Sequence, residues 1–128
     1  MYDWLICVEH LFVDIPTVQI TSSSYSVILG QNAVLGCTVT ANPTEVSVFW
    51  RKYSSQNQLV DIDMTTNNNN KYQGSVVGTP TLTIVGTTSD DAGRYVCYAV
   101  NAVGTGSSGI TTLNIDGGKQ NNYCFIFY

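Results

Sequence analysis

The stretch "SDDAGRYVCYAVNAVG", Ser89 to Gly104, decides the fold of this 128-residue chain. It gathers two adjacent carboxylates, a glycine, an arginine, a tyrosine and a cysteine between Ser89 and Cys97. Asp90 and Asp91 could serve a reactive thiolate at Cys97, or each residue could be fixed by the geometry of a fold. The rest of the sequence decides between these two interpretations.

Length and charge narrow the classes of protein to consider. The chain is long enough for one domain with its own core and too short for two comfortable ones. It carries five Lys and Arg against nine Asp and Glu, for a net charge of -4. Because no basic run is present, we expect no nucleic-acid partner. No apolar run approaches the roughly 18 residues of a membrane helix, so we expect no membrane segment in this chain.

The N-terminal segment "MYDWLICVEHLFVDI" does not have the features of a secretory signal. It begins without a basic residue, and its apolar run from Trp4 to Val8 is followed by Glu9 and His10. A secretory signal has a positive start and a longer apolar stretch. We therefore predict no convincing signal peptide, and expect a piece of a larger protein or an export signal elsewhere.

Apolar residues alternate with polar ones along most of the chain, which is the pattern of β-strands. Turn residues separate the alternating runs, and no sustained helical stripe occurs. We expect an all-β sandwich or barrel within residues 15–116, flanked by segments 1–14 and 117–128. The predicted strands are 17–21, 26–29, 33–40, 45–53, 59–62, 71–76, 81–85, 94–100 and 107–115.

Five residues carry a resemblance to a known family. Cys37 and Cys97 both face inward on predicted strands, Trp50 follows the first cysteine, and Tyr95 precedes the second by two positions. With Asp91, the stretch "DAGRYVC" resembles the D-x-G-x-Y-x-C motif of the immunoglobulin superfamily. The resemblance implies an immunoglobulin-like antiparallel β-sandwich with Greek-key topology.

The resemblance covers residues 16–115 and favours one subtype. "YAVNAVG" followed by "TTLNI" resembles I-set domains. "VGTGS" is similar to the bulged last strand of variable domains, but Gly109 stands where that pattern has an aliphatic residue. The interval 59–70 leaves room for one extra strand but hardly for two. We predict an I-set or I/V-intermediate domain, similar to invertebrate cell-adhesion or immune-type receptor domains.

The family resemblance also implies roles for the motif residues. Cys37 and Cys97 would form a disulfide between the sheets, packed against Trp50 and worth about 4 kcal/mol in the loop-entropy model. The Tyr95 hydroxyl would bond to backbone at a corner. Lys71 would form a salt bridge with Asp91, the alternative being a solvated pair worth about 0–1 kcal/mol.

The remaining motifs give little support for metal binding, catalysis or nucleotide binding. The chain has no C-x-x-C pair and one histidine, His10, so we expect neither a zinc site nor nucleophilic catalysis. "GTGSSG" precedes an alternating β-branched segment rather than a helix, which argues against a dinucleotide loop. Asp61 and Asp63 could hold calcium, but a solvated loop is the favoured interpretation. Cys7 and Cys124 could pair, stay free or bond another chain. We predict no enzyme activity, cofactor or metal.

The outward positions of two strands suggest where a partner binds. The outward-facing residues of predicted strands 45–53 and 94–100 are aromatic, apolar or arginine, as is typical of interface centres. They are Phe49, Arg51, Tyr53, Val96, Tyr98 and Val100. Predicted strands 45–53, 94–100 and 107–115 correspond to strands C, F and G of the family, and family members commonly pair through this C-F-G sheet. The resemblance therefore implies an extracellular module that binds a protein or forms a homodimer. Two alternatives stay open: the flanking segments cover this face, or the domain is a structural spacer without a ligand.

Overall fold

The computed structural model describes residues 13–64 and 70–117, which form strands and one short 3-10 helix. The flanking predictions and the cysteines at 7 and 124 lie outside these residues. In chain order the elements are β1 (Asp14–Ile20), β2 (Ser24–Ile28), β3 (Ala33–Leu35), β4 (Cys37–Asn42), β5 (Ser47–Tyr53), β6 (Leu59–Asp61), β7 (Tyr72–Val76), β8 (Thr79–Ile84), η2 (Ser89–Asp91), β9 (Gly93–Val100), β10 (Thr105–Ser107) and β11 (Thr111–Asp116). The all-β prediction is confirmed.

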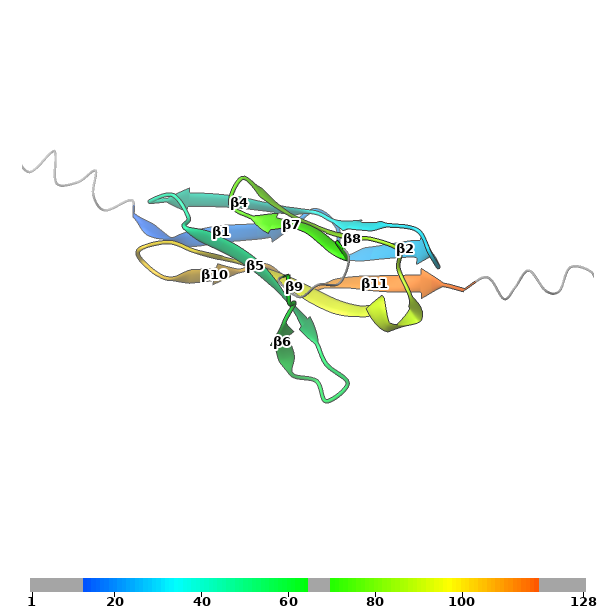
Figure 1. The fold of residues 1–128 in the computed structure, drawn as a ribbon. Helices are drawn as coiled ribbons and strands as arrows, with labels where there is room; N and C mark the ends of the chain where they lie inside the picture. The colour runs from blue at the N-terminus through cyan, green and yellow to red at the C-terminus, as the bar shows by residue number, and fades with distance from the viewer. Residues whose placement is uncertain (1–12, 65–69, 118–128) are drawn as a thin grey trace, which may run out of the picture.

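The strands form two layers (Figure 1). The first layer, called the first sheet below, consists of two hydrogen-bonded sets: β4 pairs with β1, while β3 pairs with β8, which pairs with β7. The second sheet has the order β2-β11-β9-β5-β6, with β10 also on β9. The pairs of the immunoglobulin-like sandwich are antiparallel except one: β2 runs parallel to β11. The chain changes sheets after β1, so β2 joins the far layer beside the last strand.

The predicted strand 33–40 is interrupted at Gly36, because its two halves pair with different neighbours. The Gly36 carbonyl accepts a hydrogen bond from the Thr21 backbone N–H at 3.0 Å, and its own N–H donates to the Tyr25 hydroxyl at 3.1 Å. A Cβ at this position would lie 2.2 Å from Thr21 Oγ1. Glycine therefore permits the close approach where the first sheet changes partners.

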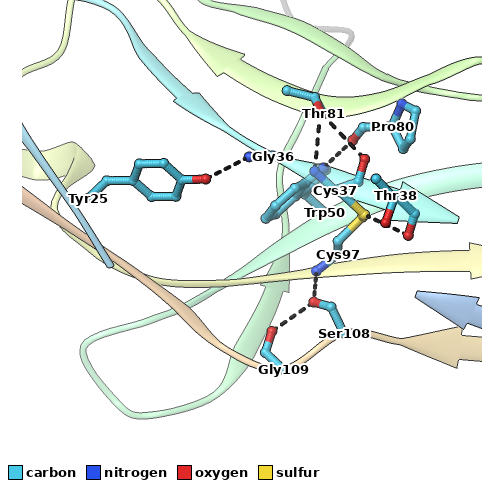
Figure 2. Close-up of a disulfide and its surroundings, with 10 residues drawn as sticks. All are labelled: Tyr25, Gly36, Cys37, Thr38, Trp50, Pro80, Thr81, Cys97, Ser108 and Gly109. Atoms are coloured by element: carbon cyan, nitrogen blue, oxygen red, sulfur yellow. Dashed lines mark hydrogen bonds between the residues drawn. A yellow bond between two sulfur atoms is a disulfide. The ribbon is translucent and has the colours of Figure 1, made fainter. Parts of the chain in front are cut away.

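The predicted last strand, 107–115, is also divided. Ser107 pairs with Tyr98 and Thr111 pairs with Tyr95, so the last strand has one more residue than β9 over this interval. Such a bulge leaves backbone groups to be satisfied in other ways. Here the Ser108 hydroxyl accepts a hydrogen bond from the Cys97 N–H at 2.9 Å (Figure 2).

The core lies between the two sheets around a disulfide. Cys37 and Cys97 are bonded, as predicted, and join β4 of the first sheet to β9 of the second. Figure 2 shows the Trp50 ring beside this bond, and its indole N–H donates to the Pro80 carbonyl at 2.7 Å. Leu35 and Leu82 are fully buried in the same cluster.

Candidate functional site

The outer face of the second sheet carries a preformed aromatic patch, made of Phe49, Arg51 and Tyr98. Phe49 on β5 lies directly opposite Tyr98 on β9. Their rings stack with centroids 5.0 Å apart and planes inclined by 3°. Such a pair contributes roughly 0.5–1.5 kcal/mol beyond its area burial, so the two rings hold each other in place. Both side chains remain partly exposed.

Arg51 completes the aromatic patch from the same strand. Its guanidinium carbon lies 5.1 Å from the Phe49 ring centroid and 5.0 Å from that of Tyr98, within the range of cation–π attraction. Its Nε donates to Asp61 Oδ1 at 2.6 Å, and this hydrogen bond raises the pKa of the guanidinium. Because Arg51 is already held in one geometry, it would lose little side-chain entropy on binding a partner.

Val96 corrects the sequence prediction, which placed it among the interface candidates. It does belong to the outer face, but it is only 5% exposed. Val96 lies opposite Arg51 on the neighbouring strand, and the Arg51 guanidinium lies over the adjacent Phe49 and Tyr98 rings. Val96 therefore supports the aromatic patch from below rather than presenting a contact surface.

Tyr53 and Val100 mark the two ends of the same face, and both are partly exposed. The Arg94 guanidinium carbon lies 4.2 Å from the Tyr53 ring centroid, and Arg94 also donates a hydrogen bond to the Asn57 side chain. Val100 lies opposite Ser47. The outer face thus continues from the aromatic patch to a second arginine–tyrosine pair at the far end of β5.

The motif carboxylate is a structural group. Asp91 Oδ2 accepts hydrogen bonds from Lys71 Nζ at 2.7 Å and from the Thr88 backbone N–H at 2.8 Å. The Asp91 side chain is only 8% exposed. Tyr95 donates its hydroxyl proton to the Asp91 carbonyl at 2.5 Å, and burial, with the nearby Asp91 charge, raises the pKa of that phenol. The predicted salt bridge and corner are therefore both present.

Asn101 holds segments together at the end of the sandwich opposite the Asp91 corner, a role that the sequence analysis did not predict. Its amide nitrogen donates to the carbonyls of Asp14 at 2.8 Å and Pro43 at 2.9 Å. Its amide oxygen accepts from the N–H groups of Val103 and Gly104. Asn101 is only 4% exposed, and it ties β1 to two loops. The available signal was an asparagine at the end of a strand, just before a glycine turn.

The metal site and the reactive thiolate considered from the sequence can be checked in the described residues. Within residues 13–64 and 70–117, no group of three or more His, Cys, Asp or Glu is placed to hold a metal ion. Cys97 is in the disulfide, so it supplies no thiolate to Asp90 and Asp91. None of the described elements is a helix long and apolar enough to cross a membrane.

Comparisons with known proteins place these features in a family. The family model described as "Immunoglobulin domain" matches residues 15–101. Roundabout homolog 1 of Mus musculus is 33% identical over 79 residues, which cover 62% of this chain and 5% of the mouse protein. The Homo sapiens protein of the same name is 33% identical over 79 residues, covering 62% of this chain and 4% of its own length. This chain therefore spans a small part of these relatives.

A solved structure agrees at the level of the fold. It is described as "Tandem Ig repeats of Dlar" and superposes with a TM-score of 0.63 at 24% sequence identity. The superposition covers 82% of this chain and 51% of the other. At this identity the likeness shows the fold alone.

Proposed function

The chain belongs to the immunoglobulin domain family, and from that premise we propose that it is a non-catalytic extracellular recognition module of the cell-adhesion or immune-receptor kind. It binds a protein, either a different one or a second copy of itself, through the outer face of the second sheet. The observation that carries this proposal is the aromatic patch, in which two stacked rings and an arginine are held ready for contact. Aromatic residues and arginine dominate the energetic centres of protein interfaces.

The proposed boundaries and subtype follow from the same architecture. We propose a domain of residues 15–116, which agrees to within one residue with the start of β1 at Asp14 and the end of β11 at Asp116. The I-set or I/V-intermediate assignment is supported by the single short strand β6 beside β5. Between β6 and β7 the described residues form no further strand, which favours an intermediate over a full variable-type sheet.

A structural spacer is the second candidate function. Its support is that β1 begins and β11 ends at opposite ends of the sandwich, so that domains could follow one another in a line (Figure 1). A spacer needs no apolar surface on its sheet face. The aromatic patch therefore makes recognition the favoured proposal, and the two functions differ in what they predict for self-association.

Sedimentation equilibrium of the full chain over a range of concentrations tests the homodimer form of the proposal. We expect the wild-type chain to self-associate and the double variant Phe49→Asp with Tyr98→Asp to be monomeric, because two buried charges would lack partners in the interface. The control is Val34→Asp. Val34 is 53% exposed on the first sheet, so this variant should associate as the wild type does. A monomeric wild type would exclude the homodimer and leave the spacer and binding to a different protein as the two remaining forms.

A further inference from the structure

Opposite charges lie at the two ends of the outer face of the second sheet. Arg94 lies at one end, beside Tyr53, and Glu45 lies at the other end, two residues before β5. Neither of these charges belongs to an ion pair within the part of the chain that the structure describes. A partner surface that supplies the missing opposite charges would be favoured at this face.

Arg94 is exposed, and its guanidinium is held from two sides. The guanidinium carbon lies 4.2 Å from the Tyr53 ring centroid, and one N–H group donates to the Asn57 amide oxygen. A guanidinium has five N–H donors in a fixed fork that suits a carboxylate, so most of its donors are left for a partner. Arg51 differs, because Asp61 already accepts a hydrogen bond from it.

Glu45 has a defined place at the opposite end of this face. The next residue, Val46, donates its backbone N–H to a carbonyl of β9 at 2.7 Å, which holds the segment against the end of that strand. Glu45 is partly exposed. The segments that meet at this end, 13–16, 43–46 and 101–104, contain no Lys or Arg, so the carboxylate has no cation on them.

The aromatic patch lies midway between the two charges. Phe49 follows Glu45 by four residues and precedes Tyr53 by four. At about 3.3 Å per residue, each end is about 13 Å from Phe49 along the strand direction. A two-fold axis through Phe49 and perpendicular to β5 would therefore bring Glu45 of one copy to Arg94 of the other. A two-fold interface repeats each contact, so the dimer would contain this pair twice.

We propose that the partner of the outer face is a second copy of this chain, packed face to face with the two β5 strands antiparallel. This inference rests on the function proposed above and names its partner. The Phe49 and Tyr98 rings of the two copies meet at the centre, and Glu45 of each copy pairs with Arg94 of the other. With the β5 strands parallel, both Arg94 side chains would lie at one level, without a carboxylate.

Charge reversal at each end, followed by mixing, tests this arrangement by sedimentation velocity of the full chain. Arg94→Glu and Glu45→Arg each place like charges at both contacts, so each variant alone should dimerise at least about tenfold more weakly than the wild type. An equimolar mixture of the two variants restores an opposite pair at both contacts and should dimerise about as tightly as the wild type. Both variants keep a net negative charge, so overall attraction does not explain such a rescue.

The matched control is the chain that carries both reversals, which should dimerise as the wild type does. If Arg94→Glu loses the circular dichroism spectrum of a folded domain, Arg94→Gln and Glu45→Gln replace the reversals, and their combination should lose no more than either alone.

Two outcomes would overturn the inference, and they are distinguishable. A dimeric wild type that neither reversal weakens, or reversed variants that mixing does not rescue, would exclude the antiparallel arrangement and leave the outer face as an interface. A monomeric wild type would exclude the homodimer itself.

Discussion

At the scale of single residues, Asp91 and Tyr95 of the opening stretch hold neighbouring segments of the chain together. Tyr95 bonds to the Asp91 carbonyl, and the Asp91 carboxylate holds Lys71 and the Thr88 backbone. The family resemblance implied the Tyr95 and Lys71 contacts, whereas the Thr88 hydrogen bond was found only in the structure. Asn101 performs a similar function at the opposite end, but its partners are far away in the chain, and local spacing gives no sign of them.

The buried phenol of Tyr95 makes stability depend on alkaline pH. Its pKa is raised in the folded state, so the folded chain binds the proton more tightly than the unfolded chain does. The free energy of unfolding should therefore fall as pH rises above about 10, the ordinary value for tyrosine. Tyr95→Phe should lose about 1 kcal/mol at neutral pH, with the hydrogen bond, and should show a shallower alkaline decline. Urea denaturation at neutral pH and across the alkaline range measures both effects.

Two other groups affect the same measurement. Lys52 acts in the opposite direction, since its lowered pKa makes the folded chain release a proton first and adds stability as pH rises toward about 10.4. Tyr72, whose pKa is raised by burial, leaves some alkaline decline in the variant. Lys52 and Tyr72 are present in both the wild type and Tyr95→Phe, so the difference between the two alkaline declines in unfolding free energy isolates the effect of Tyr95. Equal alkaline slopes in the two proteins would contradict the assignment.

At the scale of elements, alternation predicted where the strands lie, but it did not predict where a strand is interrupted. The predicted strands 33–40 and 107–115 each proved to be two strands, because each half has different neighbours. Alternation records only which face a residue belongs to. Where a strand changes partners depends on the approach of other strands, which is a property of the assembled sheets.

The close approach of β1 to β10 gives a test at this scale. A Cβ at Gly106 would lie 2.0 Å from the Pro16 backbone carbonyl oxygen, so one of the two strands would have to move. We expect Gly106→Ala to lower the free energy of unfolding by about 1–3 kcal/mol, as overpacking does. Gly109→Ala is the matched control, since a Cβ there meets nothing within 4 Å. Urea denaturation of both variants checks the prediction, and equal losses would contradict it.

At the scale of the whole molecule, the two layers are joined by the disulfide and the core around Trp50 (Figure 2). Charge is distributed unevenly over this frame. All four described cations lie on β5, at the start of β9 or just before β7.

Removal of the disulfide should show how far the two layers depend on it. The bond joins residues 60 positions apart, and the loop-entropy model gives about 4 kcal/mol for a closed loop of this length. The double variant Cys37→Ala with Cys97→Ala should therefore lose about 4 kcal/mol of unfolding free energy. The matched control is Cys7→Ser with Cys124→Ser, which keeps the inter-sheet bond. Chemical denaturation measures both, and an equal loss in the two variants would contradict this role for the bond.

From the sequence alone, alternation predicted the all-β fold class, and the family resemblance implied the cysteine pairing and the corner at Asp91, because alternation and motif residues reflect a repeating backbone geometry. It also assigned Phe49, Arg51 and Tyr98 to one face, while their use as an interface stays a prediction. Only the tertiary structure decided the burial of Val96 and the register that stacks Phe49 on Tyr98. These features depend on the side chains that neighbouring strands bring close, and residues distant in the chain become neighbours only when the sheets assemble.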